Sequence, residues 1–151
     1  MHNGVTADTG IVTEKIPLIY KIKNGDILFS WSATLEVMYW TGGIGGLNQH
    51  IFKVIPKIAN ASDYCYRQIE NYIVVFKQIA DARKTTMGHI TTDHLNQSRI
   101  AIPTNDVLNK YSKIISPFIT QYVAISHQNT RLKLFKEFLL PLLMNGQVTV
   151  I

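Results

Sequence analysis

Apolar residues in the last third of the chain recur in alternating steps of three and four residues. Such spacing places them on one face of a helix, with a single polar interruption at Asn129. The stripe comprises Leu108, Tyr111, Ile115, Phe118, Tyr122, Ile125, Asn129 and Leu132, and it continues to Leu139 and Leu143. It is too long and too narrow to be covered fully by a small preceding domain. The pattern therefore predicts a second long helix as its partner, with Asn129 fixing the register.

A proline interrupts this helical pattern. Pro117 lacks a backbone donor and clashes with the preceding turn, so two arrangements are open. Either the helix kinks at Pro117, or a first helix ends there and Ser116 caps a second one. Thr104 is the expected cap of the whole region. A continuous helix from Asn105 to about Leu140 would be on the order of 50 Å long and would act as a spacer.

The first half of the chain favours β-strands. Mixed apolar and basic residues over 18–22 predict a strand, and Asn24 and Gly25 predict a tight turn into a second strand over 27–32. These two strands would form a hairpin. After a glycine-rich loop, a further strand is predicted around 51–55, where a proline ends it.

A shorter helix is predicted after the strands. Ser62 can cap it, and its apolar positions repeat at helical spacing and should face the sheet. Those positions are Tyr66, Ile69, Ile73, Phe76 and Ala80. A polar loop over 81–88, a short turn over 92–95 and a strand over 99–102 should follow.

The chain thus divides into a domain of residues 1–103 and a helical region of residues 104–151. The fold class is α+β, with a mixed, sheet-containing domain followed by a long C-terminal α-helical (coiled-coil) spacer.

Composition and charge narrow the class of protein. With 151 residues, of which 46% are hydrophobic, the chain can build a core without disulfides. A net charge of +5 permits an acidic partner such as nucleic acid. Cys65 is the only cysteine, which excludes an internal disulfide and fits a reducing cytoplasm. Because no apolar run reaches the roughly 18 residues of a membrane span, we expect a cytoplasmic protein without a membrane partner.

Catalytic and metal-binding patterns do not emerge from the sequence. The glycine cluster over 42–46 lacks the Lys-Ser or Lys-Thr pair of a phosphate-binding loop. The five histidines lack the paired spacing of a zinc site, and the carboxylates are too scattered for a nuclease or glycosidase centre. We therefore expect no catalytic residue, no metal and no cofactor.

Two polar loops have side chains suited to DNA. Amides can read adenine, arginine can read guanine, and Lys, Ser and Thr can hold phosphates. The candidate DNA contacts are Ser30, Ser32, Asn48, Gln49, His50, Arg83, Lys84, Thr85, Thr86 and His89. The alternative is that both loops are ordinary solvated turns. Trp31 and Trp40 could stack on a base or contact a sugar, or serve the core.

Several motifs occur in an order that resembles one family. They are NGDILFSWSAT (24–34), WTGGIGGLNQH (40–50), TMGHI (86–90) followed by AIP (101–103), and NTRL (129–132) continuing to FLLPLLMNGQV (138–148). Over roughly Asn3 to Val150 the chain resembles the DNA specificity subunit of type I restriction-modification systems.

The resemblance implies a target recognition domain joined to a long helix that packs antiparallel against its counterpart. Each recognition domain would bind one half of a split double-stranded DNA sequence, and the helices would set the separation of the halves. Methylation and cleavage would belong to partner modification (methyltransferase) and restriction subunits, so the chain itself would not be an enzyme. The absence of a Pro-Pro motif, expected of an adenine methyltransferase, agrees with this, since all five prolines are isolated.

Two departures from the family pattern bear on assembly. A usual specificity subunit carries two recognition domains and two helices, whereas we expect one of each here, with a recognition domain that is incomplete at its N-terminus. We expect either a natural half that forms a homodimer through the helix or a truncated fragment. A homodimer would read a palindromic sequence. The alternative function is a protein-interaction or oligomerisation module with vestigial DNA binding.

Overall fold

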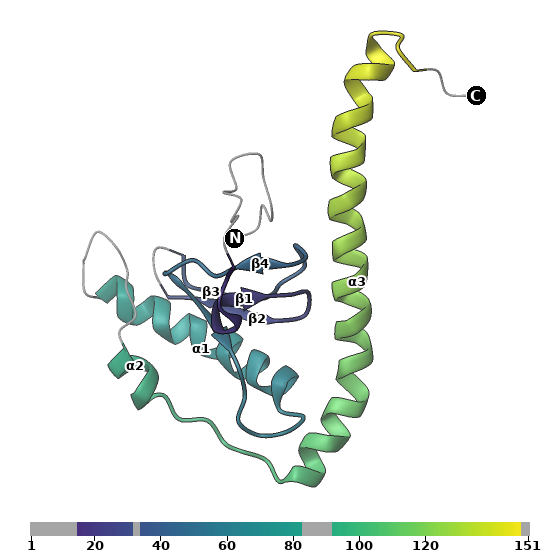
Figure 1. Ribbon diagram of the computed structural model, residues 1–151. Coiled ribbons are helices and arrows are strands. Elements are labelled where there is room, and N and C mark those ends of the chain that lie inside the picture. Colours follow the sequence, from purple (N-terminus) through teal and green to yellow (C-terminus); the bar gives the residue numbers. More distant parts are fainter. Residues whose placement is uncertain (1–14, 32–33, 83–91, 149–151) are drawn as a thin grey trace.

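The computed structural model describes residues 15–31, 34–82 and 92–148. Figure 1 shows a small sheet-and-helix domain beside one long helix, which is the expected α+β class. In chain order the elements are a 3-10 turn η1 (Leu18–Tyr20), β1 (Lys21–Ile22), β2 (Ile27–Ser30), β3 (Glu36–Tyr39), β4 (Gly45–Gly46), β5 (Ile51–Val54), α1 (Ser62–Ala82), α2 (Thr92–Gln97) and α3 (Asn105–Met144).

The main sheet has three antiparallel strands in the order β3-β2-β5. In the central strand, Ile27 lies opposite Tyr39 of β3 and Val54 of β5. All four residues of β2 are buried, because β2 has a neighbour on both edges and α1 packs on the sheet. The strand predicted around 51–55 is confirmed as β5.

The predicted hairpin between residues 18–22 and 27–32 is wrong. The turn between them does form, since Gly25 has a φ of 89° and the Lys23 amide donates to Asp26 Oδ2 at 2.8 Å. However, β1 pairs with β4 of the glycine-rich segment, and β2 forms its hairpin with β3. Because the apolar β2 pairs on both edges with β3 and β5, no edge remains for β1.

Helix α1 begins at Ser62, as predicted, and packs one face on the sheet. Phe76 is only 3% exposed, and its ring centroid lies 6.2 Å from that of Phe29 in β2. Tyr66 stacks on Tyr39 of β3 with a centroid distance of 4.3 Å. The other predicted core positions, Ile69 and Ile73, also pack against this cluster, whereas the side chain of Ala80 lies outside the described part.

The segment between α2 and α3 is not the predicted strand. Residues 98–104 run alongside α1 and have no regular secondary structure (Figure 1). The Tyr64 hydroxyl donates to the Ala101 carbonyl at 2.5 Å, and the Tyr72 hydroxyl accepts from the Arg99 amide at 3.0 Å. Tyrosines of α1 therefore satisfy backbone groups that a neighbouring strand would otherwise pair.

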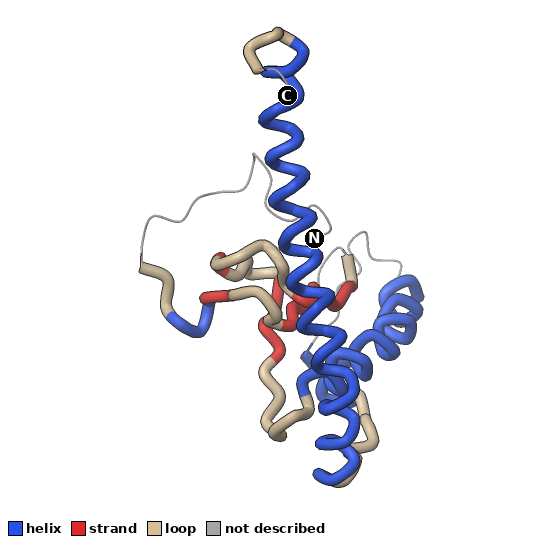
Figure 2. The backbone as a smooth tube through the Cα atoms, turned by 90° about the vertical axis from the view of Figure 1, so that its right-hand side faces the viewer, coloured by secondary structure: helices blue, strands red, loops and turns tan. Residues whose placement is uncertain are grey.

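Helix α3 is one helix of 40 residues, about 60 Å long, with Pro117 inside it. Ser116 does not cap a second helix, because its hydroxyl donates to Asp63 in α1 at 2.5 Å. Thr104 occupies the N-cap position without a side-chain capping bond. Figures 1 and 2 show that the first half of α3 lies beside the domain and that the second half projects past it.

The Phe76 side chain should carry much of the sheet–helix packing energy. Replacing Phe76 by alanine should lower the free energy of unfolding by about 3–5 kcal/mol, because a buried ring is lost and a cavity remains. Urea denaturation measures this. As the control, Val74→Ala changes an exposed residue of the same helix and should cost less than about 0.5 kcal/mol. Equal losses in the two variants would contradict this packing.

Candidate DNA-contacting turn and helix surface

An exposed turn between β4 and β5 carries three of the candidate DNA contacts. The Asn48 side-chain oxygen accepts the His50 amide at 2.9 Å, and the Asn48 carbonyl accepts the Ile51 amide at 3.0 Å. These bonds fix the backbone of the turn. Gln49 and His50 are both exposed, and their Nε2 atoms lie 3.2 Å apart. The turn thus presents amide and imidazole groups to a ligand.

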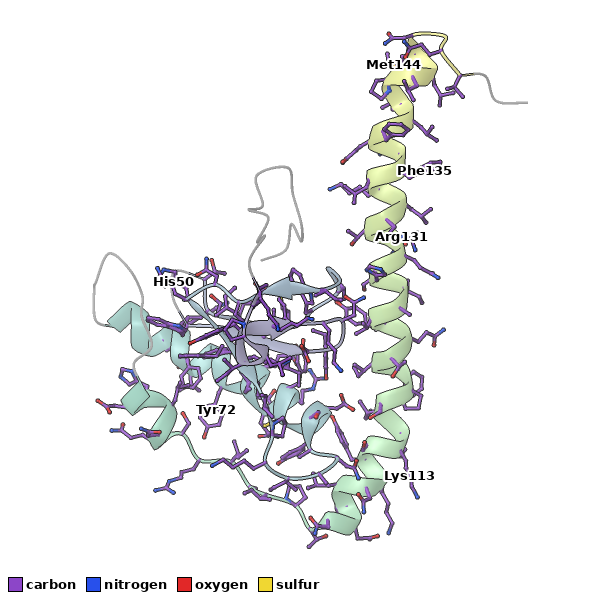
Figure 3. The ribbon with its side chains drawn as sticks, in the orientation of Figure 1. His50, Tyr72, Lys113, Arg131, Phe135 and Met144 are labelled. Atoms are coloured by element: carbon purple, nitrogen blue, oxygen red, sulfur yellow. The ribbon has the colours of Figure 1, made fainter. Side chains whose placement is uncertain are left out.

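Aromatic rings pack beneath this turn. The ring centroid of Trp31 lies 5.8 Å from that of His50 and 6.0 Å from that of Phe52, on which it stacks. Trp31 also packs against the core, so it connects the exposed turn to the sheet. In Figure 3, His50 lies at the side of the domain away from α3.

Trp40 has a different role from Trp31. Its indole Nε1 donates to the Gly43 carbonyl at 2.7 Å, and a Cβ added at Gly42 would lie 2.4 Å from the Trp40 ring. Glycine is therefore required at position 42. The glycine-rich segment is a structural loop that folds around a tryptophan and supplies strand β4.

The remaining candidate DNA contacts divide into two groups. Ser30 is only 6% exposed within β2, so it belongs to the sheet interior and is not an accessible contact. The others lie outside the described residues: Ser32, Arg83, Lys84, Thr85, Thr86 and His89. Leu95 of α2 follows residues 83–91 in the sequence. It packs against the core and, together with Phe52, lines a cavity of about 330 Å³.

The first half of α3 packs on the domain through a face offset from the predicted stripe. Its buried residues are Leu108 and Val123, and Ser112, Ser116 and Ile119 are half-buried between them. Leu108, predicted to face a partner, is 1% exposed and buried within its own chain. That assignment was wrong, because the base of α3 packs against α1.

Most of the predicted stripe beyond that point remains exposed. Phe118 and Leu132 expose 66% and 63% of their surface, and Tyr122 and Ile125 are exposed as well. Asn129 and Leu143 are also exposed, whereas Tyr111, Ile115 and Leu139 are half-buried. From Phe118 to Leu132 the stripe is therefore not folded back into its own domain.

The projecting part of α3 carries further exposed apolar side chains. Phe135 and Phe138 belong to this group, and Figure 3 labels Arg131, Phe135 and Met144 along this part of the helix. A shallow hollow of about 620 Å³ lies between Arg131, Leu132 and the two phenylalanines. An exposed apolar surface on a projecting helix is typical of an interaction site.

A buried carboxylate joins three elements of the fold. Asp63, in the first turn of α1, accepts the Tyr39 hydroxyl of β3 at 3.0 Å and the Ser116 hydroxyl of α3 at 2.5 Å. Burial, together with the charge of Asp63, raises the pKa of Tyr39 above its ordinary value. Sequence reasoning missed Asp63, whose only signal was an acidic residue near a helix start.

Comparison with known families explains this combination of domain and helix. The model of the type I restriction modification DNA specificity domain matches residues 15–134. The chain belongs to this family. It is also 23% identical, over 155 aligned positions, to the type I restriction enzyme HindI specificity subunit of Haemophilus influenzae. The alignment covers 98% of this chain and 34% of that protein, so the chain spans about a third of its length. No solved structure matches the chain.

Family membership confirms the resemblance carried by the sequence motifs. Type I specificity domains are the non-catalytic, DNA-specifying part of restriction-modification systems. Within the described ranges, no group of three or more His, Cys, Asp or Glu side chains could hold a metal. No helix in those ranges is long and apolar enough to cross a membrane.

The raised pKa of Tyr39 predicts a loss of stability in alkali. The unfolded chain releases the tyrosine proton above its ordinary pKa of about 10, whereas the folded specificity domain retains it. The contribution of Tyr39 is therefore fully present below pH about 10 and declines as the pH rises further. Urea denaturation between pH about 9 and 11 should show a steeper decline for the wild-type chain than for Tyr39→Phe. Parallel declines would contradict the assignment.

Proposed function

We propose that this chain reads one half of a split double-stranded DNA sequence and directs separate methyltransferase and restriction subunits to it. The observation that carries the proposal is a type I specificity domain fixed to a helix that projects beyond it with apolar side chains exposed. The 17 residues from Gln128 to Met144 extend for about 25 Å. A domain that only bound DNA would not need such an extension.

The proposed DNA contacts are the turn at Asn48–His50 and the segment containing Arg83 and Lys84. The exposed amides of Asn48 and Gln49 suit base edges, and the two cations suit phosphates or guanine. The net charge of +5 would favour association with the duplex. Thr85, Thr86, His89 and Ser32 complete the proposed contacts.

The proposed partner of α3 is the α3 helix of a second copy, packed antiparallel along the stripe from Phe118 to Leu143. Exposure of this stripe supports the proposal, since burying large apolar side chains stabilises a helix pair. A two-fold dimer would place two identical recognition domains on one duplex. The sequence read would then be palindromic.

A second candidate function is an assembly module whose DNA binding is vestigial. The exposed apolar residues of the projecting half favour it, because they require a partner whether or not the domain binds DNA. Selection of a duplex DNA sequence by the chain separates these two functions.

Selection from a randomised duplex library should enrich one defined half-site, because base-edge contacts discriminate between sequences. Electrophoretic separation over several rounds, at low and at moderate salt, measures the enrichment. A library that remains unenriched under both conditions would favour the assembly module.

The basic segment is tested with the selected duplex. Replacing Arg83 and Lys84 together by alanine should lower the salt-dependence slope by about 1.8, because each lost phosphate contact removes about 0.9. The matched control is the alanine pair at Lys133 and Lys136, which removes the same charge from the exposed projecting helix. Equal changes in slope for both pairs would exclude a specific role for the segment.

Dimerisation is tested by introducing charge into the stripe. Tyr122→Lys together with Leu132→Lys should weaken the dimer at least about 100-fold, since each burial contributes about 1.5–3 kcal/mol. Light scattering across a concentration series measures the change. Val74→Lys, at an exposed apolar position of α1, is the control and should leave the dimer intact. A wild-type chain that stays monomeric at all concentrations would contradict the homodimer.

A further inference from the structure

Among the residues that the structure describes, three side-chain hydrogen bonds connect the domain to α3 at different heights along the helix. They join Asn60 to Asn109 at 2.8 Å, Asp63 to Ser116 at 2.5 Å, and the Thr41 carbonyl to His127 Nδ1 at 2.9 Å. The contacts span about 27 Å of helix, from residue 109 to residue 127. The helix is thus held along its first half, and the rest projects freely from the domain (Figure 2).

The middle contact differs from the other two in charge, and from the Asn60–Asn109 pair also in burial. Asp63 is a buried carboxylate at the N-terminus of α1, where the helix dipole favours negative charge. Hydrogen bonds to an ionised group are roughly twice as strong as those between neutral groups. The Asn60–Asn109 pair, by contrast, is exposed and joins two neutral amides. The Asp63–Ser116 bond should therefore hold α3 more firmly than the outer contacts.

The Asp63 carboxylate also contacts the sheet of the domain. Its second oxygen accepts the Tyr39 hydroxyl from β3, so one group joins the sheet, α1 and α3. Ser112 adds support on α3, because its hydroxyl lies 3.0 Å from that of Ser116. The bond to Ser116 thus connects α3 to α1, whereas the Tyr39 bond connects α1 to the sheet, to which the apolar cluster around Phe76 also holds α1.

A small change in the angle of α3 at the Asp63–Ser116 contact produces a large movement at the C-terminal end of the helix. From Ser116 to Met144 the helix extends about 42 Å. A tilt of about 10° at Ser116 would displace Met144 by about 7 Å, which is the length of about two base pairs of duplex DNA.

We infer that Asp63 and Ser116 are positioning residues that set the angle between the recognition domain and α3, and with it the separation of half-sites that the protein accepts. The statement about half-sites rests on the proposed function. The statement about the angle rests only on the contacts within this chain.

Two variants separate the joint from the general stability of the domain. Ser116→Ala removes the bond between Asp63 and α3 and keeps the bond between Asp63 and Tyr39. Tyr39→Phe is the matched control, because it removes a hydroxyl from the same carboxylate but leaves the connection to α3.

Distance measurement by double electron–electron resonance tests the angle. Spin labels are placed at Lys57→Cys in the domain and Lys136→Cys on the projecting helix, both exposed, in a Cys65→Ala background. The labelled chain is diluted into an excess of unlabelled chain. Ser116→Ala should at least double the width of the distance distribution, whereas Tyr39→Phe should leave it unchanged. An unchanged width in Ser116→Ala, or equal broadening in both variants, would overturn the inference.

Binding to duplexes that carry two selected half-sites, with the spacer varied one base pair at a time, tests the consequence for DNA. Ser116→Ala should reduce the preference for the best spacer over its neighbours at least threefold and leave affinity for a single half-site unchanged. An unchanged spacer preference would overturn the half-site statement. A wild-type chain that binds no duplex would instead overturn the proposed function, and the distance measurement would still decide the angle.

Discussion

The arrangement of this molecule depends on the two hydrogen bonds that the buried Asp63 carboxylate accepts. It stands at the start of α1 and binds hydroxyls from β3 and α3, so the sheet and both long helices meet at one charged group. Without it, α3 would be held by exposed amide contacts, a histidine bond and a small apolar face around Leu108 and Val123. Helix α3 therefore has two surfaces, one bound to its domain and one exposed along the stripe.

The strands show how far residue patterns could predict this fold. Alternation and turn chemistry predicted β5 and the turn at Gly25, but they could not predict which strands pair. The four buried residues of β2 belong to a central strand, and its two partners occupy both edges. A strand order of this kind depends on contacts between distant segments, which a local pattern does not contain. Helices α1 and α3, whose pattern is local, were predicted with nearly correct ends, whereas α2 was predicted only as a short turn.

The candidate site, like the strands, was predicted only in part from the sequence. The motifs predicted the family, and the stripe from Phe118 onward proved to be exposed. The domain-facing side of α3 was missed because Ser112, Ser116 and His127 are polar and resemble solvated positions when only the sequence is considered. Their role appears only when Asp63 and the Thr41 carbonyl are placed opposite them. Polar contacts between secondary-structure elements are therefore harder to predict from sequence than apolar contacts.

The exposed turn with His50 and the joint at Asp63 lie in different parts of the domain, and His50 is at the side away from α3 (Figure 3). Substitutions in the turn can therefore accumulate without disturbing the contacts that orient the helix. If selection favours a new DNA target, the side chains of the turn can change while the contacts between the domain and α3 stay the same. In the proposed function, the DNA sequence that is bound can therefore change independently of how two copies of the chain assemble.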